Sequence, residues 1–171
     1  MGVIVRRATV TDAEAIAAVH VLGWQQGYAG LLPESYLAAL NVPSATWSER
    51  LVHAPARSAV FVAGMGGRTV GFAGVGPALE AEQPESTELG HLYTLYVLSD
   101  HWGTGVGHRL HAAALAALRA EGFSEAMLWV LADNRRAIAF YERQGWQAED
   151  VWREELLGGF SARERRYRHI F

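Results

Sequence analysis

Three glycines at alternate positions, Gly103, Gly105 and Gly107, lie between an apolar segment and a helical pattern. The apolar segment, residues 95–98, favours a strand, and leucine and alanine return at helical spacing from Leu110 onward. Glycine lets the backbone approach a ligand that any Cβ would hold off. The N–H groups of the first helical turn have no partner within the helix and favour an anion. The segment therefore predicts a cradle for phosphate or pyrophosphate, although a turn that binds nothing would share its pattern.

Two common nucleotide motifs do not fit this segment. A P-loop places lysine after its last glycine, but His108 follows Gly107, and all fifteen basic residues of the chain are arginine. The dinucleotide pattern GxGxxG fails because the residue three after Gly105 is again His108. A nucleotide-binding module of either kind is therefore disfavoured.

A second motif, Asn134 to Trp146, follows the next apolar strand and reads Asn-Arg-Arg-Ala-Ile-Ala-Phe-Tyr-Glu-Arg-Gln-Gly-Trp. Together with the glycine turn it resembles the Gcn5-related N-acetyltransferase (GNAT) superfamily. That family has an acyl-CoA loop, Gln/Arg-x-x-Gly-x-Gly/Ala, and then Asn-x-x-Ala-x-x-Phe-Tyr-x-x-x-Gly-Phe/Trp. Gly105 and Gly107 match the loop. The residues that match the second motif are Asn134, Ala137, Phe140, Tyr141, Gly145 and Trp146. Trp102 stands where the family has Gln or Arg, which puts one side-chain contact to phosphate in doubt.

The resemblance implies the GNAT fold, of class α/β (α+β). This fold is a mixed central sheet of about seven strands flanked by helices, with a splay between strands 4 and 5. A chain of 171 residues is long enough to form one such domain, residues 1–171. The resemblance also implies an N-acetyltransferase that takes acetyl-CoA as acyl donor and a primary amine as acceptor.

The pattern of apolar residues, caps and glycines predicts the order of the elements. The expected strands are residues 3–7, 58–65, 68–75, 88–97, 125–131, 146–157 and 162–170. The expected helices begin after the capping box at residues 11–14, at Pro33, at Ser44, at Val106 and at Arg135.

Residues of the fourth strand and the glycine turn are matched to the cofactor by the resemblance. Leu95, Tyr96 and Val97 would supply a free strand edge for the pantetheine arm. The pyrophosphate cradle would comprise Gly103, Thr104, Gly105, Val106, Gly107 and His108. Asn134 matches the family asparagine that contacts the cofactor, and it also suits the N-cap of the following helix.

Tyr141 matches the family's general acid, which protonates the departing thiolate. A phenol with an ordinary pKa near ~10 is protonated when a thiolate with a pKa near ~8.5 leaves. A buried hydroxyl packed beside Phe140 is the alternative interpretation.

The predicted general base is His91, which occupies a fourth-strand position that is often glutamate in the family. Strand alternation would put it on the same face as Tyr93 and Leu95. An imidazole with a pKa near ~6.5 is largely neutral at physiological pH, but a histidine bonded within the sheet fits equally well. Glu88 and Tyr93 are the reserve candidates, and Glu88 needs a bulge or loop to turn inward. Trp129, where other members carry a glutamate base, cannot act as one.

In the GNAT fold the region of the first two helices forms one wall of the acceptor cleft. Trp24, Tyr28 and Tyr36 are expected there, with Tyr93 as a further acceptor contact, although each could equally be a core aromatic. The expected acceptor is a small-molecule amine or an amino acid. The alternatives are a protein N-terminus or lysine, or a non-catalytic acyl-CoA-binding regulatory domain.

Composition narrows the remaining classes. The net charge is −3 without a basic run before the C-terminus, so no nucleic-acid partner is expected. There is no cysteine, and the seven histidines are scattered, so no metal site is expected; His108 and His111 are predicted to be surface residues. Without a signal peptide or an apolar run near ~18 residues, no membrane contact and a cytoplasmic location are expected. The terminal hairpin is a candidate contact for a homodimer.

Overall fold

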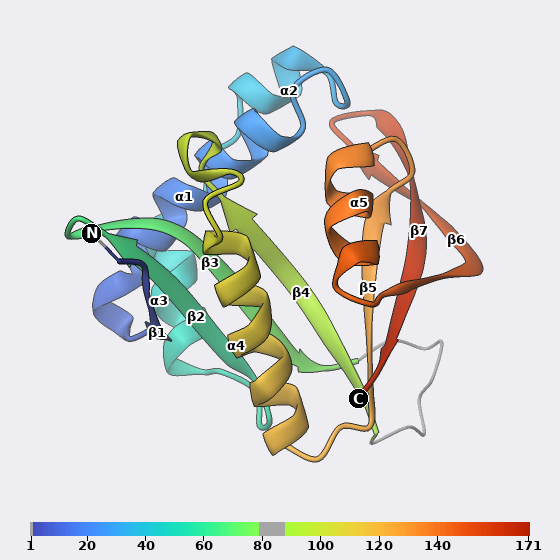
Figure 1. Cartoon of the computed structure of the whole chain (residues 1–171). Helices are drawn as coiled ribbons and strands as arrows, with labels where there is room; N and C mark the ends of the chain where they lie inside the picture. Colours follow the sequence, from blue (N-terminus) through green and yellow to red (C-terminus); the bar gives the residue numbers. More distant parts are fainter. Residues whose placement is uncertain (1, 79–87) are drawn as a thin grey trace.

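Alternating apolar segments build one mixed sheet in the computed structural model, which describes residues 2–78 and 88–171. Its strands are β1 (Ile4–Arg7), β2 (Ala59–Met65), β3 (Arg68–Pro77), β4 (Leu89–Val97), β5 (Glu125–Leu131), β6 (Gln147–Leu157) and β7 (Phe160–Ile170). Within the described ranges the sheet has seven strands in the order β1-β2-β3-β4-β5-β7-β6 (Figure 1). β4 and β5 are parallel, and the other neighbours are antiparallel. This confirms the predicted mixed sheet.

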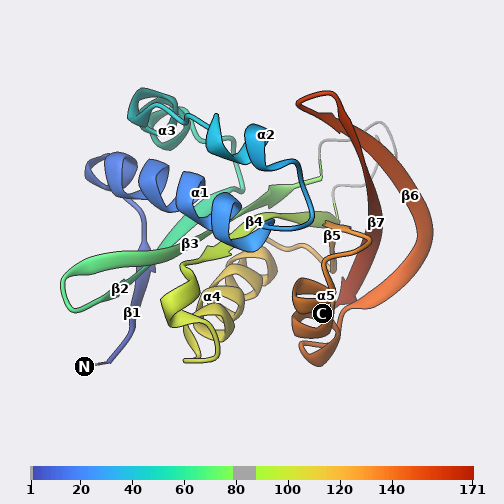
Figure 2. The same cartoon turned by 90° about the horizontal axis from the view of Figure 1, so that it is seen from above.

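Helices cover both faces of the sheet. They are α1 (Ala13–Gly27), α2 (Glu34–Ala38), α3 (Ser44–Val52), α4 (Val106–Ala120) and α5 (Arg135–Arg143), with short 3₁₀ turns at Val10–Asp12 and Ser99–His101. Figure 2 shows α1, α2 and α3 on one side of the sheet and α4 and α5 on the other. The sheet therefore has an α1 face and an α4 face, and each face carries its own core.

Helical spacing places the apolar side chains of α4 and α1 on these two cores. Leu110, Ala114 and Leu118, four residues apart along α4, are fully buried against the sheet. On the other face, Ile16 of α1 and Phe72 of β3 belong to a second buried cluster. Gly66 and Gly67, with positive φ (58° and 77°), form the turn between β2 and β3, which match the strands predicted at residues 58–65 and 68–75.

The pairing of β4 with β5 is short, and this produces the splay. Only the pairs Leu89–Glu125, Gly90–Ala126 and His91–Met127 are formed. Beyond them the two strands diverge, and Figure 1 shows them meeting at one end and separating toward the other. The remainder of β4 therefore pairs with β3 alone.

A β-bulge interrupts β4 close to this point. Gly74 pairs with Thr94 and Val75 with Leu92, so Tyr93 is the extra residue of the bulge. The bulge changes the alternation of side chains: Leu92 and Leu95 both join the core on the α4 face. The expectation that Leu95 shares a face with His91 and Tyr93 was therefore wrong, because simple alternation ignores the extra residue.

Candidate active site

A cavity of about 380 Å³ opens where β4 and β5 separate. Its walls come from the upper half of β4, the glycine turn, α5, β5 and the C-terminal end of α1. The splay thus brings together the two motifs that the sequence singles out.

The edge of β4 that faces the cavity carries free backbone groups. The N–H of Leu98 donates to the carbonyl of Val70 on the β3 side (2.9 Å). Because backbone groups alternate along a strand, those of Val97 and Leu95 point the other way, into the gap. The Trp102 indole N–H donates to the Val97 carbonyl oxygen (2.7 Å). The N–H of Val97 and both backbone groups of Leu95 therefore lie on an edge that an extended ligand can pair with.

The glycine turn ends this edge and begins α4. Gly103 and Gly105 have φ values of 74° and 90°, a left-handed conformation that favours glycine. Gly105 is the N-cap of α4, and the first helical bond runs from the Arg109 N–H to its carbonyl (3.1 Å). The preceding N–H groups of the first turn have no acceptor within the helix, so they are available to an anion at the cavity.

The predicted cofactor residues differ in how they meet this cavity. Those that line it are Leu95, Tyr96, Val97, Gly103, Gly105, Gly107, His108, Asn134 and Tyr141. Val106 is instead fully buried in the core of the α4 face. The Thr104 hydroxyl donates to the carbonyl of His101 (2.7 Å). Only the backbone of these last two residues is therefore suited to the predicted cradle.

Two predicted residues of the second motif line the opposite wall. The side chain of Asn134 accepts a hydrogen bond from the Ala137 N–H (3.2 Å), which makes it the N-cap of α5. Burial raises the pKa of Tyr141, and the neighbouring Tyr28 raises it further, while the charge of Arg136 opposes the shift. The Tyr141 hydroxyl therefore holds its proton at neutral pH.

The aromatic residues expected at the acceptor wall form two layers. Tyr28, just after α1, lines the cavity, and a hydrogen bond links it to Tyr96 of β4. Trp24 packs edge-on against Tyr28, with ring centroids 4.9 Å apart, and Tyr36 packs against Trp24 at 6.5 Å. Trp24 and Tyr36 are not among the cavity-lining residues, so they support the wall from behind.

The candidate bases lie at or below the point where the strands separate. The His91 ring packs against that of Tyr93, with centroids 4.5 Å apart, and only Tyr93 of this pair lines the cavity. Burial, aided by the charge of Arg153, lowers the pKa of His91 to about 4. Glu88 does not turn inward as its candidacy requires. It is exposed at the paired end of the strands, where its carboxylate accepts a hydrogen bond from Ser124 (3.4 Å).

Arg136 also lines the cavity, although no sequence motif predicts it there. Its guanidinium carbon lies 3.7 Å from the centre of the Trp102 ring. A nitrogen of the same group lies 3.3 Å from where a Cβ on Gly27 would stand, so glycine at that position leaves room for it. The family motif leaves position 136 unspecified, and the contact joins three distant segments, so no local signal could have revealed it.

Other site types find little support among the described residues. No group of three or more histidine, aspartate or glutamate side chains in residues 2–78 and 88–171 is arranged to hold a metal ion. Within the same ranges, no helix is long and apolar enough to cross a membrane.

The expectation that His111 is a surface residue was wrong: it is buried, and its Nε2 accepts a hydrogen bond from the Trp146 indole (2.8 Å).

Comparison with known proteins decides the family. The profile of the acetyltransferase (GNAT) family matches residues 24–146. The chain belongs to this family. It is therefore an acetyltransferase of the GNAT type, as the two sequence motifs predict.

Curated relatives differ in how much of their length this GNAT chain spans. It is 36% identical to an uncharacterized N-acetyltransferase, YuaI, of Bacillus subtilis, over 82% of this chain and 78% of that protein. It is 39% identical to the mycothiol acetyltransferase of Kocuria rhizophila, but over 40% of this chain and only 24% of that protein.

Solved structures show the same fold at low sequence identity. The PaiA N-acetyltransferase of Thermoplasma acidophilum, in complex with coenzyme A, aligns with a TM-score of 0.81 at 18% identity and covers 100% of both chains. The ribosomal-protein-alanine N-acetyltransferase of Brucella melitensis aligns with a TM-score of 0.79 at 22% identity, over 98% of this chain and 99% of that one. These similarities concern the fold.

Proposed function

We propose that this enzyme transfers the acetyl group of acetyl-CoA to a primary amine of a small molecule or an amino acid. The observation that carries the proposal is the open edge of β4, which ends in the glycine cradle and faces the Tyr141 hydroxyl across one cavity. An elongated thioester with a diphosphate at its far end suits this layout. The structural neighbour that holds coenzyme A supports the same choice of donor.

The residues divide the work of binding along the cavity. The N–H groups at the start of α4 bind the diphosphate. The free groups of Leu95 and Val97 pair with the amides of the pantetheine arm as a missing strand would. Asn134 lies beside that arm at the start of α5. The thioester is thereby directed toward the bulge at Tyr93, where the two strands separate.

Tyr141 supplies the proton for the leaving group. The amine nitrogen attacks the thioester carbonyl, the new C–N bond forms, and the C–S bond breaks with its electron pair on sulfur. Because burial keeps the Tyr141 phenol protonated, its hydroxyl is able to donate to that thiolate as the C–S bond breaks, and the phenolate then regains a proton from solvent before the next turnover. The retained phenol favours an enzyme over a binding domain without catalytic activity.

His91 is the proposed base, acting through a water beside Tyr93. Its imidazole is neutral at pH 7 because its pKa is about 4, so it can accept a proton from the amine. The same low pKa makes it a weak base that holds the proton only in passing. The proton must then leave to solvent before the next turnover.

The packing of α2 favours a small acceptor over a protein chain. Leu32 and Leu37, before and within α2, share a buried cluster with Leu131 of β5 and Ala162 of β7. The Tyr36 ring lies directly against Gly158 at the turn of the β6–β7 hairpin. The α1–α2 segment thus packs against the hairpin across the end of the cleft, which narrows the approach for a polypeptide.

An acceptor panel tests the proposal. The protein is mixed with acetyl-CoA and with alkylamines, amino acids, or peptides that carry a free N-terminus or lysine, and both free thiol and acetylated product are measured. We expect thiol release that depends on a small amine. Release only with peptides would assign a protein substrate, and acetyl-CoA binding without turnover of any amine would assign a binding domain. Relatives and neighbours are named for both mycothiol and ribosomal-protein alanine, so both arms are needed.

A further inference from the structure

Thr94 and Trp129 occupy matching levels on the two strands that separate. Trp129 lies two residues beyond Met127, the last residue of β5 that pairs with β4. His91 is the β4 partner of Met127. Thr94 lies three residues beyond His91, and one of those three residues is the bulged Tyr93. Both residues line the cavity. They therefore stand on either side of the gap, just above its closed end.

Both side chains point to the α1 face of the sheet. The Thr94 hydroxyl lies 3.0 Å from where a Cβ on Gly74 would stand, and Gly74 shares its face with Phe72 of the α1-side core. Leu128 and Val130, on either side of Trp129, belong to the core of the opposite face. The indole of Trp129 and the hydroxyl of Thr94 thus both face the acceptor wall built by α1.

Each side chain carries a buried polar atom without a hydrogen-bond partner among the described residues. These atoms are Nε1 of Trp129 and Oγ1 of Thr94. Leaving a buried N–H or hydroxyl unpaired is costly, and native structures rarely do so without a ligand or water at the site. An indole N–H can only donate, so the missing partner of Trp129 is an atom that accepts a hydrogen bond.

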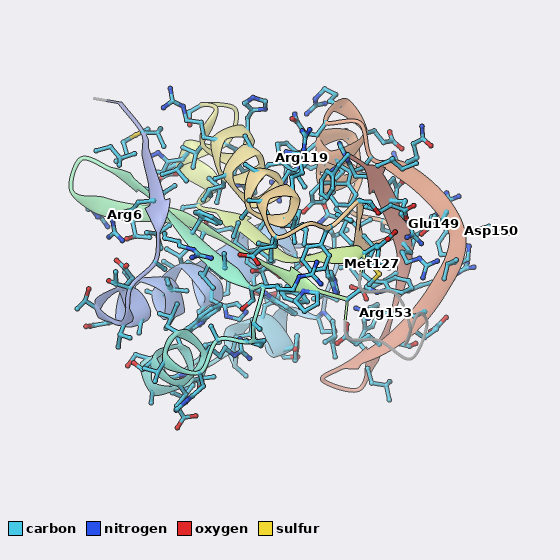
Figure 3. The ribbon with its side chains drawn as sticks, turned by 90° about the horizontal axis from the view of Figure 1, so that it is seen from below. Arg6, Arg119, Met127, Glu149, Asp150 and Arg153 are labelled. Carbon is cyan, nitrogen blue, oxygen red and sulfur yellow. The ribbon has the colours of Figure 1, made fainter. Side chains whose placement is uncertain are left out.

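The indole is held in place before any ligand arrives. The guanidinium carbon of Arg153, on β6 (Figure 3), lies 4.4 Å from the centre of the Trp129 ring. Nε of Arg153 donates in turn to the Glu164 carboxylate on β7 (2.6 Å). A donor fixed by such packing loses little freedom when it binds a ligand.

We infer that the Trp129 indole N–H and the Thr94 hydroxyl bind an oxygen atom that the acceptor carries close to its reacting amine. The acceptor class is then an α-amino carbonyl compound, such as an amino acid or its amide, in preference to a plain alkylamine. This inference rests on the proposed function and narrows its substrate class.

Matched acceptors and conservative variants test the inference. Trp129→Phe removes the N–H and keeps a ring beneath Arg153, and Thr94→Val removes the hydroxyl at nearly the same shape. Alaninamide and isopropylamine are compared as acceptors, since only the first carries the oxygen. We expect kcat/KM for alaninamide to fall about 10- to 100-fold, the usual cost of an unpaired buried donor. The kcat/KM for isopropylamine should change less than about twofold, and the affinity of each variant for acetyl-CoA should stay the same.

Trp152→Phe, on the exposed part of β6, is the matched control and should change kcat/KM for neither acceptor. An equal loss for both acceptors would overturn the inference, because the donors would then serve the acetyl carbonyl. Unchanged kinetics for both would overturn it as well.

A binding measurement separates the inference from the proposed function. Alaninamide is titrated by calorimetry into the protein saturated with coenzyme A, where no transfer occurs. If Trp129→Phe weakens alaninamide binding at least about tenfold, the site is supported even when the wild type turns over no amine. In that case the acceptor panel would contradict the proposed function and leave this inference intact. Binding that the variant leaves unchanged would overturn the site.

Discussion

The guanidinium of Arg136 on α5 stacks on the indole of Trp102, whose N–H donates to the Val97 carbonyl at the open edge of β4. Trp102 stands where other members of the family carry Gln or Arg. Here the aromatic residue fixes the upper end of the edge and holds a cation from the opposite wall. The two residues therefore connect the halves of the cavity that the splay separates.

Loss of this stack should weaken acetyl-CoA binding. Trp102→Leu removes both the bond to Val97 and the platform for Arg136, and a cation–π contact is worth about 0.5–2 kcal/mol. We expect the acetyl-CoA Kd from calorimetry to rise about tenfold. Arg136→Leu should give part of this loss, and the double variant less than the sum. Arg119→Leu, which removes a cation–π contact with Phe171 from α4 (Figure 3), is the control and should not change the Kd.

The fold could be predicted well because its signals are local. The Gly66–Gly67 turn, the Gly158–Gly159 turn between β6 and β7, the apolar strands and the second motif each depend on neighbouring residues. The N-cap role of Asn134 could be read from the motif as well. The burial of His111 also had a usable signal, since it lies beside Leu110 and three residues before Ala114 on the buried face of α4.

The finer geometry of the site could not be predicted because it depends on pairings between distant segments. The bulge at Tyr93 is visible only in the register of β4 against β3. The approach of Arg136 to Trp102 and Gly27 depends on how α1, the glycine turn and α5 meet. The low pKa of His91 follows from burial that alternation alone does not reveal.

Gly107→Val, with Gly107→Ala as its control, should separate binding from folding in the cradle. Gly107 lies in the first turn of α4 without a positive φ, and a Cβ there would meet Phe140 at 3.5 Å, an ordinary contact. Gly107→Ala should unfold at the wild-type denaturant midpoint or above it, since alanine favours helix, and it should keep the wild-type acetyl-CoA Kd because the family motif admits alanine at this position. The γ-methyl groups of Gly107→Val would reach further into the proposed cradle, so its acetyl-CoA Kd should rise about tenfold. An unchanged Kd in a folded Gly107→Val protein would place the cradle elsewhere.

His111→Gln should reduce the acid sensitivity of the fold. The pKa of His111 is lowered from 6.5 to about 4, mainly by burial. The unfolded chain therefore binds the extra proton first, so this contribution to stability is complete above pH 6.5 and is lost as the pH falls toward 4. Glutamine can still accept from the Trp146 indole but does not titrate. The urea midpoint of the variant should change less between pH 7 and pH 5 than that of the wild type. An equal change of the midpoint in the two proteins would contradict the assignment of this acid sensitivity to His111.

Tyr141→Phe should slow catalysis without loss of donor binding. The variant removes the proton that the proposed mechanism gives to the thiolate, and loss of a general acid typically costs ~10²–10⁴-fold in rate. We expect kcat to fall at least about 10²-fold, with acetyl-CoA Kd within about twofold of wild type. Tyr167→Phe, a buried tyrosine of β7 outside the cavity lining, is the control and should keep its kcat. Wild-type kcat in Tyr141→Phe, with chemistry shown to limit the rate, would remove Tyr141 from the acid role.

The pH dependence of kcat/KM should follow the acceptor amine and not the His91 imidazole. With a pKa of about 4, His91 is already neutral throughout the range in which an ordinary histidine titrates, so it produces no limb near pH 6.5. An alkylammonium with a pKa near ~10.4 must lose its proton before attack, so kcat/KM should rise with pH toward that value. Replacing the acceptor by a less basic amine should move the limb downward by the difference in amine pKa. His91→Gln should lower kcat and leave the position of the limb unchanged. A limb near pH 6.5 that stays fixed when the acceptor changes, and disappears in His91→Gln, would show instead that the imidazole titrates normally in the reacting complex.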